Sequence, residues 1–160
     1  AFLDAFVYLG GSGMILGLII ALIIAGRRRK DMIALGLAPS VFNISEPVIF
    51  GLPIVLNPIY MIPFVLAPVV CSAVAYLAID MGLVMPVIAA KIPWVTPPIL
   101  GGFLATGHWT GAALAAVNLL ISIVIYIPFV IAAEKIDKRK ATLATDQGND
   151  DDFSFDDLEF

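Results

Sequence analysis

The feature that most constrains this chain is the near absence of charge over residues 32–133. That stretch contains only Glu46, Asp80 and Lys91 as charged side chains. A typical soluble protein has about a quarter of its residues charged, because its surface must face water. Here 61% of all residues are hydrophobic, 14% are charged and the mean hydropathy is +1.01. We therefore predict an all-α integral membrane protein whose partner is the lipid bilayer.

Two basic clusters border the apolar region and predict its orientation. One is Arg27 to Lys30, and the other lies within residues 135–140. Cytoplasmic loops next to membrane segments carry an excess of Lys and Arg. We expect both clusters, and the C-terminal tail, to be cytoplasmic in a multi-pass protein of the cell membrane.

Three apolar runs are predicted to span the membrane as helices. The first, Ala5 to Gly26, would rise roughly 33 Å as a helix, enough for a hydrocarbon core of about 30 Å. Within it, Gly13 and Gly17 have the spacing that allows another helix to approach closely. The other two spans are residues 60–83 and 110–133, with prolines as expected kinks or ends.

Two further apolar stretches are interrupted by proline and polar residues, namely 32–59 and 84–108. Proline removes a backbone donor, and lipid cannot satisfy the groups that are left unpaired. Such segments are typical of re-entrant hairpins near a transporter binding site. Two hairpins or two full spans would both return residue 134 to the cytoplasmic side, so the sequence leaves this choice open. Our prediction is about three spanning helices and two re-entrant hairpins.

The acidity of the chain is concentrated at its C-terminal end. Residues 134–160 hold nine acidic and four basic side chains, a net −5, which leaves residues 1–133 at +1 of the total −4. Clustered like charge with few apolar residues is typical of disorder. We predict a membrane-embedded domain over 1–134 and an acidic, mostly disordered cytoplasmic tail over 135–160.

Glu46 is the leading candidate for chemistry. It lies in PSVFNISEPVIFGLPIVLNP, residues 39–58, between Ser45 and Pro47. An ionisable group at mid-membrane costs about 2.5–3.5 kcal/mol, so such groups usually face cavities and carry function. Its carboxylate could accept a hydrogen bond or a proton from a substrate hydroxyl. Alternatively, Asn43, Ser45 and Glu46 could cap a half-helix starting at Val48, with Pro47 in its first turn.

A second candidate is the block KIPWVTPPILGGFLATG, residues 91–107. Trp94 could stack on the apolar face of a sugar ring while Thr96 bonds a hydroxyl. Trp94 and Trp109 could equally be interfacial belt residues, and that reading is preferred for Trp109. His108 is interpreted as an interfacial polar side chain.

Several functional classes are not indicated. Cys71 is the single cysteine and lies in an apolar run, so no disulfide framework or cysteine metal site can be built within the chain. We expect no metal, no cofactor and no nucleic acid partner. Lys91 is interpreted as a snorkelling side chain and Asp80 as a span-end residue, with no role for either.

Three blocks make the sequence resemble a known family: FLDAFVYLGGSG (2–13), FNISEPVIFGLPIVLNP (42–58) and IPWVTPPILGGFLATG (92–107). Together they resemble the C-terminal half of EIIC, the membrane component of the bacterial phosphoenolpyruvate-dependent sugar phosphotransferase system, of the lactose/cellobiose/chitobiose type. The resemblance covers residues 1–134.

The resemblance implies a permease that binds and translocates a di- or oligosaccharide while a phosphorylated IIB partner phosphorylates it, with IIA and the phosphocarrier protein upstream and a homodimer as the assembly. It implies Glu46 as the catalytic, sugar-binding carboxylate and Trp94 as an aromatic residue beside the sugar. Asn43, Ser45 and Thr96 are further expected substrate contacts.

The family's sugar-facing histidine belongs to an upstream portion, and His108 does not match its motif. We therefore expect a piece of a longer protein that is the permease part of a phosphotransferase and is inactive alone. The alternative is an ion-coupled secondary transporter of a small polar solute, which interrupted segments and Glu46 would also suit.

Overall fold

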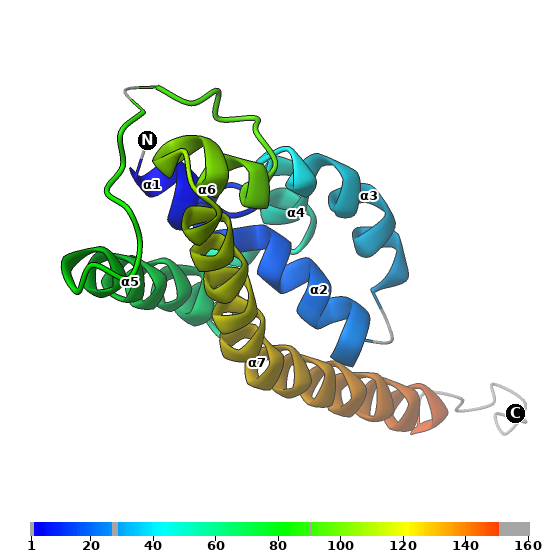
Figure 1. Cartoon of the computed structure of the whole chain (residues 1–160). Helices are drawn as coiled ribbons and strands as arrows, with labels where there is room; N and C mark the ends of the chain where they lie inside the picture. The colour runs from blue at the N-terminus through cyan, green and yellow to red at the C-terminus, as the bar shows by residue number, and fades with distance from the viewer. Residues whose placement is uncertain (1, 27–28, 90, 151–160) are drawn as a thin grey trace, which may run out of the picture.

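The computed structural model describes residues 2–26, 29–89 and 91–150, with side chains to residue 145, and these residues form helices and loops without strands. The elements are α1 (Phe2–Phe6), η1 (Ser12–Met14), α2 (Ile15–Ala25), α3 (Lys30–Val41), α4 (Glu46–Gly51), η2 (Ile54–Leu56), α5 (Pro58–Asp80), α6 (Pro98–Thr106) and α7 (Trp109–Asp150). The predicted all-helical fold is confirmed. Figure 1 shows α7 running diagonally through the molecule, and it packs against α2, α5 and α6.

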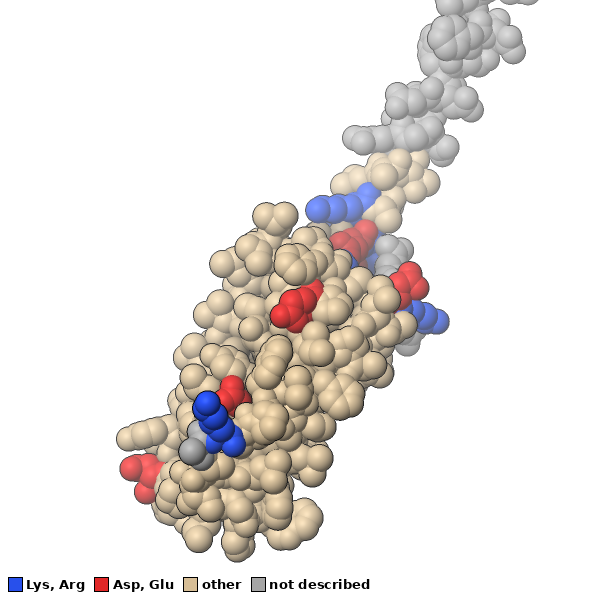
Figure 2. Space-filling model, turned by 90° about the horizontal axis from the view of Figure 1, so that it is seen from above, with Lys and Arg blue, Asp and Glu red and all other residues tan. Residues whose placement is uncertain are grey.

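Helices α5 and α7 are each long and apolar enough to cross a membrane. The apolar windows within them are only 22% and 39% buried, whereas the core helix of a soluble protein would be mostly buried. Many large apolar side chains on both helices therefore remain exposed, among them Val65, Tyr76, Leu120 and Val124. The face in Figure 2 likewise carries few acidic or basic side chains. This surface suits lipid or another apolar partner, not water.

The expectation of one continuous helix over residues 5–26 is wrong. The chain instead breaks between α1 and α2, where Gly10, Gly11 and Gly13 have φ angles of 89°, 90° and 72°. Glycine reaches this left-handed region readily, and the non-glycine residue Met14 also adopts it, with φ 56°. With 11 residues, α2 rises only about 16 Å, which is too short to span alone.

Side chains of α7 stabilise this break by pairing the freed carbonyl groups. Asn118 Nδ2 donates to the carbonyl oxygens of Phe6, at 2.8 Å, and of Cys71, at 3.2 Å. The Tyr126 hydroxyl donates to the carbonyl of Gly13. Both donor side chains, Asn118 and Tyr126, are fully buried, as is Cys71 on α5. Internal pairing of this kind is what allows broken backbone at membrane depth.

The predicted close approach at Gly13 and Gly17 is confirmed, although the two glycines meet different helices. A Cβ atom at Gly13 would overlap the ring of Phe64 on α5, and one at Gly17 would overlap the Ser122 side chain on α7. The glycines therefore allow α2 and the preceding turn to sit directly against both long helices.

The two interrupted segments are broken in the structure. Residues 32–59 form most of α3, a turn, α4 and η2 before α5 begins at Pro58. Residues 84–97 are irregular in their described part and lead into α6, and Figure 1 shows this segment arching from the end of α5 to α6. The number of membrane crossings and the re-entrant hairpins stay predictions.

Residues 135–150 of the predicted tail continue α7. The division into a membrane-embedded domain and a disordered cytoplasmic tail stays a prediction. Extending an existing helix needs no new nucleation. Residues 135–144 are rich in good helix formers, mostly Lys and Ala, with one Arg and one Leu. The Thr142 and Thr145 hydroxyls donate to the carbonyls of Lys138 and Ala141. The remainder of the tail prediction, residues 151–160, lies outside the described residues.

Candidate functional site

The turn between α3 and α4 places Asn43, Ser45 and Glu46. The backbone amide of Asn43 donates to the Ser40 carbonyl at 3.1 Å, and the backbone amide of Ile44 donates to the Pro39 carbonyl at 3.0 Å. With Asn43 at φ 61°, these two bonds form the Schellman motif that ends many helices. Asparagine is, after glycine, the residue most often found there. The local sequence thus stops α3 and lets α4 start at Glu46 after a tight turn.

The Asn43 side chain joins this turn to two other segments. Its Oδ1 atom accepts from the Gly10 amide at 2.8 Å, and its Nδ2 atom donates to the carbonyls of Trp94, at 2.6 Å, and Thr96, at 3.1 Å. Asn43 is 3% exposed. One buried amide therefore connects the three sequence blocks that carry the family resemblance.

The Gly-rich segment fits tightly against the turn. A Cβ atom at Gly11 would lie 2.7 Å from the Asn43 carbonyl oxygen and 2.8 Å from the Ser45 side chain. Ser45 itself is buried. Gly10 and Gly11 are part of this site. The sequence interpretation missed that role because it considered this glycine run only for helix packing, at Gly13 and Gly17. The GGSG run was the available signal.

The loop that carries Trp94 is held through its backbone. The Thr96 amide and hydroxyl both donate to the Pro93 carbonyl, at 3.0 Å and 2.6 Å, which forms a tight turn. The Trp94 residue is 56% exposed, while its backbone carbonyl accepts a hydrogen bond from the Asn43 side chain. The ring is therefore presented outward from an anchored loop.

Glu46 begins α4 and its residue is exposed. The expected half-helix is present with Pro47 in its first turn, but it starts at Glu46 and not at Val48. Ser45, at the N-cap, makes no side-chain capping bond. The Asn43 side-chain amide bonds Gly10, Trp94 and Thr96 and does not cap α4. The described hydrogen bonds therefore do not support Asn43 or Ser45 as a helix cap. The Glu46 carboxylate is at a helix start, where partial positive charge favours an anion.

Four residues that the sequence analysis left without a functional role are Asp80, Lys91, His108 and Trp109, and the structure shows where they lie. Trp109 packs on Phe103 with ring centroids 5.4 Å apart, and the His108 backbone bonds the Thr106 hydroxyl. Asp80 and Lys91 are exposed. Among the described residues, no group of three His, Cys, Asp or Glu side chains is placed to hold a metal ion.

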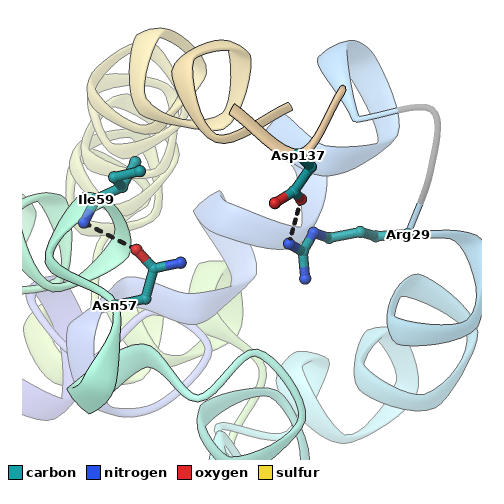
Figure 3. Close-up of polar contacts among 4 residues, drawn as sticks. All are labelled: Arg29, Asn57, Ile59 and Asp137. Carbon is teal, nitrogen blue, oxygen red and sulfur yellow. Dashed lines mark hydrogen bonds and ion pairs between the residues drawn. The ribbon is translucent and has the colours of Figure 1, made fainter. Parts of the chain in front are cut away.

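A second polar cluster, which the sequence did not reveal, connects the two basic regions. Arg29 Nη2 lies 2.6 Å from Asp137 Oδ2, and its guanidinium carbon is 5.6 Å from the centre of the Tyr60 ring. Figure 3 shows Arg29 and Asp137 facing each other, with Asn57 capping the start of α5 nearby. The described part of the first basic region, Arg29 and Lys30, therefore lies at the same end of the molecule as residues 135–140. Which side of the membrane this end faces stays a prediction.

Comparison with known proteins agrees with the resemblance seen in the sequence. Residues 1–68 match the family described as Phosphotransferase system, EIIC. The cellobiose-specific EIIC component of Lactococcus lactis subsp. lactis is 51% identical over 138 residues, 84% of this chain and 28% of that protein. The oligo-beta-mannoside-specific EIIC component of Bacillus subtilis is 44% identical over 134 residues, 82% of this chain and 30% of that protein.

A solved structure shares the fold. The crystal structure of the transporter ChbC, the IIC component from the N,N'-diacetylchitobiose-specific phosphotransferase system, superimposes with a TM-score of 0.80 at 39% identity, covering 86% of this chain and 33% of that chain. In both fold and sequence the chain therefore matches the EIIC components of phosphotransferase systems. The chain belongs to the EIIC family. It spans about a third or less of the length of these relatives.

Proposed function

We propose that this chain provides the sugar-binding part of a phosphotransferase-system permease. The permease would bind and translocate a di- or oligosaccharide of the cellobiose, chitobiose or lactose kind, coupled to its phosphorylation by IIB. EIIC components work in that system with EIIB and a sugar. The relatives of this chain are named for cellobiose, oligo-beta-mannoside and lactose.

The observation that carries the proposal is the Asn43 bridge. It ties the turn that ends in Glu46 to the loop that presents Trp94. A carboxylate at the start of α4 and an exposed aromatic ring on a loop tied to the preceding turn are the pair of groups that a sugar needs, because its hydroxyls bond carboxylates and its ring faces are apolar. In this proposal Trp94 stacks on the sugar, and Ser45 and Thr96 lie near its hydroxyls.

Glu46 has the catalytic role in the proposal. A sugar hydroxyl attacks the phosphoryl group carried by IIB. The bond between that phosphoryl group and the IIB side chain breaks as the new oxygen–phosphorus bond forms, IIB leaves with the electron pair, and the hydroxyl must lose its proton. The Glu46 carboxylate accepts that proton or the hydrogen bond that precedes its transfer. The residues of this chain supply binding and proton acceptance, while the phosphoryl group comes from the partner.

The arrangement in the membrane is also part of the proposal. The end that carries Arg29 and Asp137 faces the cytoplasm of a bacterial cell, where IIB is phosphorylated through IIA and the phosphocarrier protein. The exposed apolar faces of α5 and α7 contact lipid, the rest of the permease or a second copy in a homodimer.

The energy source tests the proposal. The complete natural protein that contains this chain is reconstituted in proteoliposomes with labelled cellobiose, and phosphorylated IIB is added on the side that corresponds to the cytoplasm. We expect accumulation of sugar phosphate that requires phosphorylated IIB and persists when ion gradients are collapsed. Unphosphorylated IIB is the matched control. Uptake that needs an ion gradient, ignores phosphorylated IIB and yields unmodified sugar would establish a secondary transporter instead.

A further inference from the structure

Asn43 both ends α3 in the left-handed conformation and bonds distant segments through its side chain. The helix end by itself requires only the first of these. A left-handed residue at this position is most often glycine, which makes the turn without a side chain. Asn43 makes the same turn and adds a side-chain amide with both donors and its acceptor engaged in the chain. Those partners are 33, 51 and 53 residues away in the sequence. The side chain is thus committed to holding segments together and has little capacity left for a ligand.

The Trp94 loop depends on this amide. Between α5 and α6, the backbone amides of residues 81–84 donate to carbonyls in the last turns of α5, and those of Ile88 and Ala89 donate to the Ala105 carbonyl. These bonds hold the beginning and middle of the segment. The Pro97 carbonyl accepts from the Gly101 amide in the first turn of α6, and no backbone bond from residues 91–96 to another element is described. At the far end of the segment, next to α6, the tight turn of Pro93 to Thr96 is tied to the α3–α4 turn by the two Asn43 donor bonds.

We propose that Asn43 is a positioning residue that holds the Trp94 loop at a fixed place relative to Glu46, and that it is not itself a sugar ligand. This inference rests on the proposed sugar site and replaces the sequence-based expectation that Asn43 contacts substrate. It follows that Asn43 affects sugar affinity through Trp94. Glu46 is set by the backbone of the turn, which glycine at position 43 would preserve.

The test is a double-mutant cycle in the complete natural protein, with phosphorylation of cellobiose by phosphorylated IIB as the assay. Trp94→Ala is expected to raise KM by roughly tenfold, the scale of one aromatic contact. Asn43→Gly keeps the left-handed turn and removes the amide, so it is expected to raise KM by several-fold with kcat nearly unchanged. Adding it to Trp94→Ala should raise KM no further, because the two act through one contact.

A second variant and a matched control guard against general destabilisation. Asn43→Asp keeps the acceptor for the Gly10 amide but loses both donors to the loop, and it should behave as Asn43→Gly does. Asn118→Ala is the control, because Asn118 is also a buried asparagine whose amide donates to two backbone carbonyls, but on α7. Its effect on KM should add to that of Trp94→Ala.

Hydrogen exchange gives a readout that needs no sugar. Peptides covering residues 91–97 should exchange faster in Asn43→Gly and Asn43→Asp and remain as in the unmodified protein in Asn118→Ala. Additive effects of Asn43→Gly and Trp94→Ala, a fall in kcat with unchanged KM, or unchanged exchange at 91–97 would each overturn the inference. If the unmodified protein phosphorylates no sugar, the proposed function itself is overturned, whereas additivity with normal phosphorylation overturns only the role of Asn43.

Discussion

Arg29 and Asp137, 108 residues apart in the sequence, form an ion pair of 2.6 Å that joins the segment before α3 to the end of the apolar part of α7. The side chains are 24% and 39% exposed, so the pair is partly shielded from water. Arg29 also lies over the Tyr60 ring on α5. Three segments, which carry Arg29, Tyr60 and Asp137, therefore meet at one guanidinium group.

Removing this pair should weaken the protein measurably. Asp137→Asn leaves the guanidinium of Arg29 without its counter-charge. We expect the free energy of unfolding to fall by about 1–2 kcal/mol. This value lies between those for exposed ion pairs and those for charge-assisted hydrogen bonds in protected sites. Thermal unfolding in detergent measures it, with the exposed neighbour Lys138→Gln as control. A melting temperature equal to that of the control would show that the pair contributes nothing.

The contact of Gly17 with Ser122 predicts a rescue experiment. In Gly17→Ala the new methyl group overlaps the Ser122 side chain, and overpacking of this kind costs about 1–3 kcal/mol. The double variant Gly17→Ala with Ser122→Gly removes the overlapping atoms and should recover most of the lost melting temperature, since the next neighbour is the Ile123 amide nitrogen at 3.4 Å.

The control for this pair is Gly101→Ala, where the nearest atom to an added Cβ is 3.9 Å away. That substitution should be neutral or slightly stabilising, because alanine favours the helix. Equal losses in Gly17→Ala and Gly101→Ala, or no recovery in the double variant, would disprove the close approach of α2 and α7.

Asn118 is predicted to hold the broken N-terminal segment in place. Asn118→Leu substitutes an apolar side chain of similar size and removes the bonds to the carbonyls of Phe6 and Cys71. The Phe6 carbonyl, at the end of α1, loses its donor, which costs about 1–3 kcal/mol for a buried unpaired group. The melting temperature should fall clearly, and hydrogen exchange over residues 2–10 should accelerate. Val117→Ala on the exposed side of the same helix is the comparison, and an Asn118→Leu protein as stable as that one would refute the role.

The sequence predicted those features of the fold that depend on composition and local pattern. Apolar length indicated the helices now seen as α5 and α7, and proline with polar residues indicated the breaks around Glu46 and before α6. The same pattern gave a wrong prediction over residues 5–26. Hydropathy contains no information on the positive φ angles of the three glycines, or on the hydrogen bonds that Asn118 and Tyr126 of α7 donate to backbone carbonyls at this break. Tertiary hydrogen bonds decided that break.

The candidate site was predicted only as separate parts. Residues 42–58 and 92–107 were identified, but nothing in either block shows that the amide of Asn43 bonds the carbonyls of Trp94 and Thr96, because the backbone groups of a partner loop leave no trace in composition. The same reason hid the Arg29–Asp137 pair. The basic cluster at residues 27–30 was interpreted only as a sign of membrane orientation. Its Arg29 also forms an ion pair with Asp137, and that contact depends on the fold.

The measurement that tests the central claim most directly is the rate of sugar phosphorylation after loss of the Glu46 carboxylate. In the complete natural protein with phosphorylated IIB and cellobiose, chitobiose or lactose, Glu46→Gln should lower the rate for the preferred sugar by about 10²–10⁴-fold, the range for loss of a general base. Asp80→Asn, an exposed carboxylate at the end of α5, should retain the rate. Equal rates and equal sugar binding in Glu46→Gln and Asp80→Asn would contradict the account.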